Sequence, residues 1–328
     1  MTKPIFVSNQ DMTIMIICYR KKLKIHRISY TENSVEKYTL IYEFVFQKNI
    51  MSVNFHPITN SILAIGFESG CVKLFKFSPD EILPDRLSCI ATLNGHKNDV
   101  LSLTFNPDGS ILASGSKDET VILFEITYDG DILTATHAMT IVNIRKGAYS
   151  LAYNEDGSIL AIGAGNNEVI FKQFTKLQYS SSISSFSGCI NCICFLRILG
   201  FFAVSSGSIV SIFSQTESGS LYSKLVFKIN IGFHVSSICY DPTSNLLMIG
   251  CSNGIKLFHI SYDSSSEKLN AVSKMNITGL SDVNAVSFHP SEEILIISSI
   301  SGVSFWRHDA SLTCVANIEN NRKWWLDE

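Results

Sequence analysis

One phrase of sequence recurs along this chain, and it constrains the fold more than any other feature. The clearest copy, residues 100–126, reads VLSLTFNPDGSILASGSKDETVILFEI, and related copies begin at Ile50, Ala148, Ile190, Val235 and Val283. An aromatic residue closes the first segment of each copy. Successive aromatics are 50, 48, 42, 45 and 48 residues apart: Phe55, Phe105, Tyr153, Phe195, Tyr240 and Phe288. Self-similarity at a nearly fixed period indicates an array of like-built units.

Within each copy the hydrophobic pattern has the period of a β-strand. Leu103 and Phe105 face one way in the first segment, whereas Ser102 and Thr104 face the other. The positions equivalent to Ser102 hold small residues, which suits close packing of sheet on sheet: Ser52, Ser150, Cys192, Ser237 and Ala285. A second apolar run such as Ile111–Gly115, a third run and a weaker fourth follow, separated by turn residues. We therefore predict four strands per copy.

Six copies and a faded one in the first fifty residues make seven units. The spacing is close to the ~40–45 residues of a four-stranded propeller blade. We predict an all-β, seven-bladed β-propeller of four-stranded antiparallel blades, spanning the chain as a single domain. The blades are expected at about 4–46, 50–94, 99–142, 147–187, 189–230, 234–278 and 282–320, with a tail at 321–328. Ile5–Ser8 is either the first blade's own inner strand, or part of a segment Lys3–Ser8 that serves the last blade.

At this point the chain resembles the WD40-repeat β-propellers. The resemblance is strongest where Gly95-His96, a Pro-Asp-Gly turn and Leu-Ala-Ser-Gly-Ser-x-Asp (112–118) occur in order. It implies a structural hydrogen-bonded set of His96, Ser114 and Asp118. The Trp-Asp signature is degenerate, and the indole position of this set holds Phe124, which cannot donate a hydrogen bond. Since the other copies lack the polar set, we expect their blades to rest on apolar packing, in keeping with a chain that is 46% hydrophobic.

The resemblance also implies a binding module. In WD40 relatives, the loops that enter each blade and those between strands two and three form a face that holds a peptide or partner domain. The residues expected to bind a partner are Lys48, Lys97, Asp99, Arg145, Lys146, Phe233 and His234 in these loops, and Trp324 and Trp325 near the end of the chain. The two Trp either pack on the last blade or anchor a partner. Cations dominate the inter-blade loops, so an acidic or phosphorylated peptide is the expected ligand.

Composition excludes several classes of function. The net charge of −3 argues against a protein that coats nucleic acid, and no stretch approaches the ~20 apolar residues of a membrane span. The basic residues at Arg20–Lys22 follow the apolar run Met12–Cys18, whereas a secretory signal has them before it. Nine cysteines without framework spacing suit a reducing compartment. We expect a cytoplasmic or nuclear protein, monomeric within a hetero-complex.

Three local sequence patterns can also be interpreted as specific binding sites. Cys189, Cys192 and Cys194 have spacing that could hold a metal. Cys192, however, fills the small-residue position of the first strand, and Cys194 fills the position that Cys239 holds in the next copy, so we predict no metal and no cofactor. The basic stretch 20–27 is either a solvated rim or a stripe for an anionic partner. Ile144-Arg145-Lys146-Gly147 is similar to the Phe-Arg-Arg-Gly element of phosphoinositide-binding propellers, with Lys in place of one Arg, so a membrane-surface role is the alternative function.

Catalytic patterns are missing from the sequence. It contains neither a phosphate-binding loop nor a nucleophile, base and acid within one recognisable motif. We therefore predict no catalytic residues and a non-enzymatic role, as a protein–protein interaction scaffold.

Overall fold

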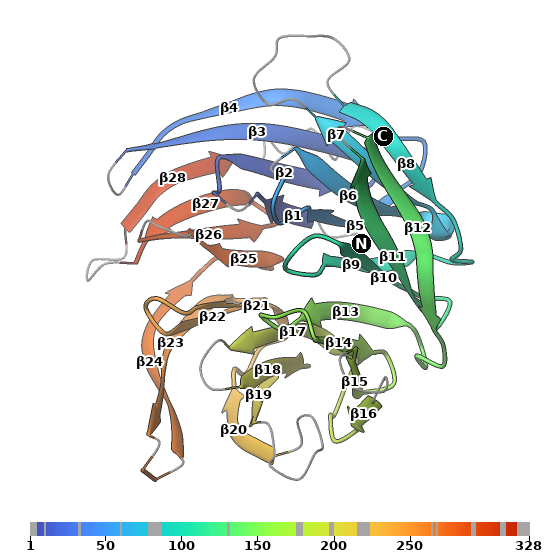
Figure 1. Ribbon diagram of the computed structural model, residues 1–328. Coiled ribbons are helices and arrows are strands. Elements are labelled where there is room, and N and C mark those ends of the chain that lie inside the picture. Colours follow the sequence, from blue (N-terminus) through green and yellow to red (C-terminus); the bar gives the residue numbers. More distant parts are fainter. Residues whose placement is uncertain are drawn as a thin grey trace. The chain divides into compact units, whose positions relative to one another are not determined.

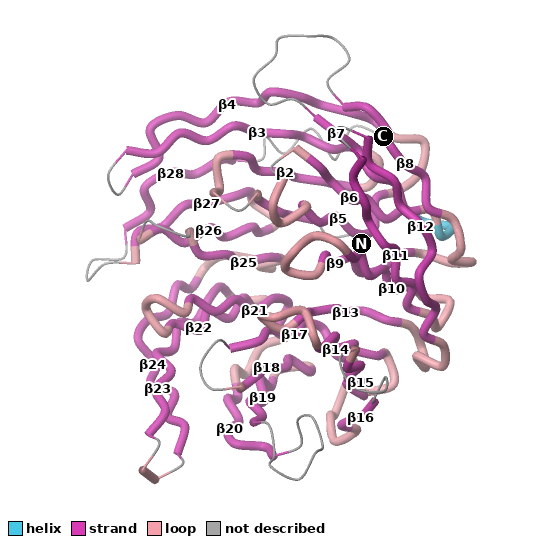
Figure 2. Tube along the Cα trace, viewed as in Figure 1, coloured by secondary structure: helices cyan, strands magenta, loops and turns pink. Residues whose placement is uncertain are grey.

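The computed structural model describes residues 5–9, 11–31, 34–59, 61–77, 87–129, 132–174, 180–196, 200–214, 224–263, 265–266, 268–289, 293–308 and 313–319. This part of the chain forms 28 β-strands in seven four-stranded antiparallel sheets (Figure 1), which is the seven-bladed β-propeller fold. Within it, the one helical segment is a 3-10 turn at Glu68–Gly70 (cyan in Figure 2). None of the described segments is a helix that is long and apolar enough to cross a membrane.

The chain divides into two compact units. The first comprises residues 1–29 and 36–166, and the second comprises residues 30–35 and 167–328. The strands of the first three sheets are β1 (Ile5–Ser8), β2 (Ile14–Tyr19), β3 (Lys22–Thr31), β4 (Ser34–Val45), β5 (Ile50–Phe55), β6 (Ile62–Phe67), β7 (Val72–Phe77), β8 (Leu87–Leu93), β9 (Val100–Phe105), β10 (Ile111–Ser116), β11 (Val121–Asp129) and β12 (Ile132–Ile141).

The fourth sheet begins in the first unit, and the remaining sheets belong to the second. Their strands are β13 (Ala148–Tyr153), β14 (Ile159–Ala164), β15 (Glu168–Gln173), β16 (Ser180–Ile183), β17 (Ile190–Leu196), β18 (Phe201–Ser206), β19 (Ile209–Ser214), β20 (Lys224–Asn230), β21 (Val235–Asp241), β22 (Leu246–Cys251), β23 (Gly254–Asp263), β24 (Lys268–Thr278), β25 (Ala285–Phe288), β26 (Ile294–Ser299), β27 (Gly302–Arg307) and β28 (Thr313–Glu319).

The first and last sheets each contain four strands of their own. β1 pairs with β2, with Ile5 opposite Cys18, and β28 is the fourth strand of the last sheet. The prediction that Ile5–Ser8 is the first blade's own strand is therefore confirmed, and the alternative that this segment serves the last blade is wrong. The remainder of that alternative, Lys3 and Pro4, lies outside the described residues.

The second strand of each sheet is the most deeply buried. Every residue of β6, β14, β18 and β26 is buried. The continuous apolar runs predicted these strands, because a strand covered on both faces has no polar alternation. The outer strands β8 and β24 consist mostly of exposed or partly exposed residues. The outer strand β16, Ser180–Ile183, is short and consists mostly of serine.

Glycine near the end of the second strand is required by the adjacent sheet. A Cβ atom on Gly115 would lie 2.5 Å from Oγ of Ser102 and 2.7 Å from Cβ of Ala148, the first residue of β13. Gly66 is confined in the same way, with Val100 of β9 2.7 Å from its missing Cβ. The run therefore ends in glycine because neighbouring sheets approach closely there.

The small residue of the first strand connects adjacent sheets of the first unit by hydrogen bonds. Oγ of Ser52 donates to the carbonyl oxygen of Val100 at 2.7 Å, and Oγ of Ser102 donates to that of Ala148 at 3.1 Å. The repeat thus places a hydroxyl where it both fits and satisfies a backbone carbonyl of the next sheet.

Candidate functional site

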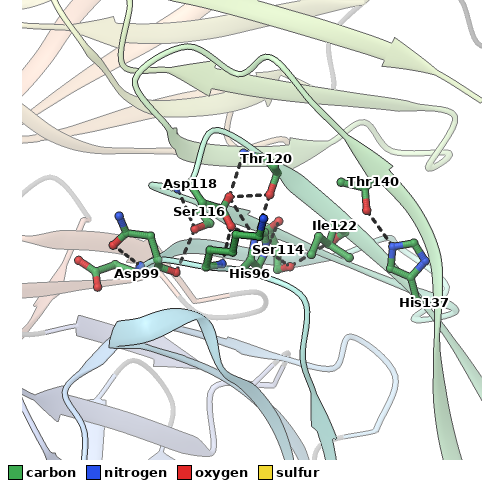
Figure 3. Close-up of polar contacts among 11 residues, drawn as sticks. His96, Asp99, Ser114, Ser116, Asp118, Thr120, Ile122, His137 and Thr140 are labelled. Carbon is green, nitrogen blue, oxygen red and sulfur yellow. Dashed lines mark hydrogen bonds and ion pairs between the residues drawn. The ribbon is translucent and has the colours of Figure 1, made fainter.

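The three residues expected to form a structural polar set lie together at one end of the sheet β9–β12. Nδ1 of His96 lies 3.1 Å from Oδ2 of Asp118, and Nε2 lies 2.8 Å from Oγ of Ser114 (Figure 3). His96 and Ser114 are buried, and Asp118 is partly exposed. The dashed lines of Figure 3 connect this set to Thr120 and Ser116, whereas the pair His137 and Thr140 stands apart.

The protonation of the set follows from its surroundings. Burial lowers the pKa of His96, although Asp118 opposes this shift, so the imidazole is neutral at pH 7. Burial also disfavours ionised Asp118, but hydrogen bonds from Thr120, the Lys97 amide and His96 hold its pKa below the ordinary value. We infer that His96 carries its proton on Nδ1, facing the carboxylate, and that Nε2 accepts from the Ser114 hydroxyl.

Thr120 is a member of this network that the sequence analysis missed. Its Oγ1 donates to Oδ1 of Asp118 at 2.6 Å and lies 3.0 Å from Nδ1 of His96. Its amide also donates to Asp118, at 3.0 Å. A hydroxyl residue two positions after an Asp in a hairpin turn is the signal that could have found it. Phe124, at the indole position, is buried and packs edge-on to His137 at 6.4 Å.

Exposed cations lie on what we call the loop face of the first unit. It consists of the turns and inter-blade loops that carry Arg20, Lys21, Lys48, Lys97, Lys117, Arg145 and Lys146, all exposed. Backbone hydrogen bonds hold loop to turn in each sheet. Examples are the Lys117 amide to the Asp99 carbonyl at 2.9 Å and the Glu68 amide to the Asn49 carbonyl at 3.0 Å. The cations are therefore carried on fixed backbone.

The acidic residues of the loop face are engaged by backbone amides. Each of the four carboxylates accepts at least one, from Asn49 to Glu68 at 3.1 Å, Ser69 to Asp99 at 3.3 Å, Lys97 to Asp118 at 2.7 Å and Lys146 to Glu119 at 2.9 Å. The bonds from Asn49 lower the pKa of Glu68, which stays ionised. Nζ of Lys48 contacts the Ser69 hydroxyl. The carboxylates thus stabilise the loops, while most cationic groups face solvent.

The remaining predicted binding residues lie elsewhere. Phe233 and His234 belong to the second unit, in the loop before β21, and both are exposed. The His234 carbonyl accepts the Ser252 amide at 3.1 Å, so this loop is anchored like those of the first unit. Trp324 and Trp325 lie outside the described residues.

The basic stretch 20–27 does not form a continuous exposed stripe. Lys24 forms an ion pair with Glu43 of β4 at 3.5 Å. His26 is only 3% exposed and stacks on Tyr38 at 4.9 Å between ring centroids. Its burial follows from the neighbouring strand β4, which a pattern read along one strand does not include.

The cysteine cluster is divided between surface and sheet. Cys189 is exposed, whereas Cys192 and Cys194 are partly buried on β17. The Cys192 thiol lies 3.8 Å from the Ile238 carbonyl oxygen, and that of Cys194 lies 3.7 Å from the Phe195 carbonyl. Among the described residues, no three His, Cys, Asp or Glu side chains are grouped so that they could hold a metal ion.

Comparison with known proteins agrees with this fold. Residues 87–125 match the family model described as WD domain, G-beta repeat. Polyadenylation factor subunit 2 of Eremothecium gossypii is 35% identical over 71 residues, which are 22% of this chain and 16% of that protein. Pre-mRNA-processing factor 19 of Oryza sativa subsp. japonica is 28% identical over 125 residues, 37% of this chain and 22% of that protein. The chain thus spans less than a quarter of the length of these relatives.

Solved structures share the fold over most of the chain. A chain in the crystal structure of the mitotic checkpoint complex superposes with a TM-score of 0.73 and 17% identity, over 93% of this chain and 89% of that one. Chaetomium thermophilum Sqt1 bound to the N-terminus of the ribosomal protein L10 superposes with a TM-score of 0.67 and 14% identity, over 87% and 78%. The seven sheets define a β-propeller. Within this propeller, residues 87–125 are similar in sequence to a WD40 repeat.

Proposed function

We propose that this chain is a non-catalytic protein–protein interaction scaffold of an intracellular multiprotein complex. Its ligand is an acidic or phosphorylated segment of a partner protein, which binds the loop face of the first unit. Two curated relatives are named for polyadenylation and pre-mRNA processing, and one solved neighbour is bound to a protein N-terminus. These names support a cytoplasmic or nuclear scaffold, and the chemistry of the ligand rests on the loop face itself.

The observation that carries this proposal is the excess of cationic over acidic side chains on the loop face. All four carboxylates accept backbone amides of the loops, which fixes their positions, and the loop face carries seven exposed cations against these four carboxylates. Lys97 and Arg145 are exposed on neighbouring loops. An anionic segment would be steered by such a surface, and little conformational entropy would be lost because the backbone is already fixed.

A peptide selection tests the proposal. The immobilised protein selects from a library of peptides randomised over twelve positions, synthesised with and without phosphoserine. Wild-type protein should enrich Asp, Glu and phosphoserine, and Lys97→Glu/Arg145→Glu should abolish that enrichment. The matched control is Lys228→Glu/Lys274→Glu, which makes the same charge change on exposed lysines of outer strands and should behave as wild type.

The alternative, an anionic membrane surface, is separated by sedimentation with phosphatidylcholine vesicles that contain or lack a phosphoinositide. The lipid proposal would replace the peptide proposal under two conditions. The protein would have to sediment with phosphoinositide vesicles in a way that depends on Lys97 and Arg145, and it would have to enrich no acidic peptide. Equal enrichment of acidic peptides by wild type and the double reversal would show that the loop face is not the binding surface.

A further inference from the structure

Three strands of the first unit share a β-bulge at the same place. In β5, Ile50 and Ser52 pair with the consecutive residues Phe67 and Gly66, so Met51 is the extra residue. By the same criterion, Leu101 is the bulge residue of β9 and Tyr149 that of β13. A bulge re-aims the side chain of its extra residue, and such residues concentrate beside functional sites. We call Met51, Leu101 and Tyr149 the apolar row.

The apolar row is accessible to solvent. Tyr149 is 41% exposed, and Met51 and Leu101 are partly exposed. The three residues follow one another because β5, β9 and β13 are successive neighbours, joined by the Ser52 and Ser102 hydrogen bonds described above. Sheets packed face to face are about 10 Å apart, so the row spans about 20 Å, or about six residues of extended chain.

The row adjoins the cations of the loop face. A Cβ atom on Gly165 would lie 2.8 Å from Cε2 of Tyr149 and 3.0 Å from Cβ of Lys146, so these two side chains flank the same glycine. A Cβ atom on Gly147 would lie 3.0 Å from Cα of Lys117 and 3.7 Å from Cδ1 of Leu101. Tyr149 therefore lies beside Lys146, and Leu101 lies near the backbone of Lys117.

The second unit shows what a bulge residue does when it serves the fold. Asn191 of β17 and Ser236 of β21 occupy the equivalent bulges. Nδ2 of Asn191 donates to the Val235 carbonyl at 3.1 Å, and the Ser236 hydroxyl donates to the Val283 carbonyl. Polar residues at this position connect one sheet to the next, whereas Met51 and Leu101 have no side-chain donor and Tyr149 presents an aromatic ring. Partly exposed apolar side chains in a row, beside exposed cations, are characteristic of an interface.

We propose that the apolar row receives the apolar side chains of an extended partner segment whose flanking residues are acidic. This rests on the proposed function of the loop face and specifies its ligand. The cations bind the acidic flanks and set the rate of association, while the row buries the apolar side chains and sets the lifetime of the complex. The cations of the loop face require acidic residues on either side of the apolar stretch. The length of the apolar row, about six residues of extended chain, sets the length of that stretch.

The same peptide library tests this inference without presupposing a sequence. Wild-type protein should enrich peptides with two or three apolar residues within about six positions, bounded by acidic ones. Met51→Asn/Leu101→Ser/Tyr149→Asn should remove the apolar preference, weakening the best peptide at least tenfold in fluorescence anisotropy while acidic enrichment persists. These substitutions use residue types that the second unit carries at its own bulges, and unchanged thermal unfolding checks the fold.

The outcomes separate the two proposals. Acidic peptides without an apolar preference would overturn the apolar row and leave the proposed function standing. Apolar peptides without acidic flanks would overturn the proposed function, and with it the claim that the flanks are acidic. A wild-type protein that enriches nothing would overturn both. Because the wild-type selection alone decides the apolar preference, the test does not depend on the variant folding.

Discussion

In the sheet β9–β12 the position four residues before the first strand holds His96, and in the sheet β5–β8 the same position holds Phe46. The position of Ser114 is taken by Ile65, and both sheets have Phe at the indole position, Phe124 and Phe75. In β5–β8 the rings form a cluster, with Phe46 5.2 Å from Phe67 and 5.5 Å from Phe75. One sheet fills this place with hydrogen bonds and the other with aromatic contacts.

The difference teaches what each solution requires. A buried polar set is stable only when every member has a partner, because an unpaired group keeps its full desolvation penalty. The aromatic cluster has no such condition, and its members can be exchanged at the cost of packing alone. The polar set also uses Asp118 to hold the Lys97 amide, so in β9–β12 the core of the sheet and the shape of its binding loop are coupled.

The largest difference between the two sheets is expected when the carboxylate of Asp118 is removed. Asp118→Ala should destabilise the protein by about 3 kcal/mol, because it leaves the Thr120 hydroxyl, two backbone amides and His96 without their acceptor. Ser69→Ala, at the equivalent position of the aromatic sheet, should cost less than about 1 kcal/mol. Chemical denaturation of both variants measures the difference, and equal costs would show that the two sheets do not differ in this way.

His26 sharpens the comparison, because it is a buried imidazole without a carboxylate. Among the described residues neither ring nitrogen has a hydrogen-bond partner. Burial, with Lys24 adding to it, lowers its pKa from 6.5 to about 4. Its neutral form therefore stabilises the fold fully above pH 6.5, and this contribution is lost as the pH falls toward 4. Between pH 7 and pH 5 the loss is about 2 kcal/mol.

His26→Phe should remove that part of the pH dependence while keeping a ring against Tyr38. Unfolding free energies at pH 7 and pH 5 should then converge by about 2 kcal/mol relative to wild type. Some dependence should persist, because burial also lowers the pKa of His56 and His96. An unchanged difference between the two pH values would show that His26 is not the group that titrates.

The sequence was sufficient for what depends on local pattern. Repeat spacing and period two predicted seven four-stranded sheets, and His96, Ser114 and Asp118 stood in one recognisable phrase. It was insufficient where the surroundings of a residue depend on a neighbouring strand or turn. Tyr38 of β4 covers His26, the hairpin turn directs Thr120 to Asp118, and a bulge that exposes Tyr149 does not appear in an alternating pattern. Each of these features depends on how strands and turns are placed against one another, which the pattern of a single segment does not show.

The smallest effect we predict compares the two indole positions directly. Phe124→Trp places an indole donor on the same face of the sheet as the Ser114 hydroxyl, whereas Phe75→Trp places it on the same face as the aliphatic Ile65. Both substitutions enlarge a buried ring, with an overpacking cost of about 1–3 kcal/mol, but only the first gains a hydrogen bond worth about 1 kcal/mol. Phe124→Trp should therefore be the less destabilising by about 1 kcal/mol in urea unfolding. Adding Ser114→Ala should abolish that advantage, and its persistence would mean that the polar set does not accept the indole.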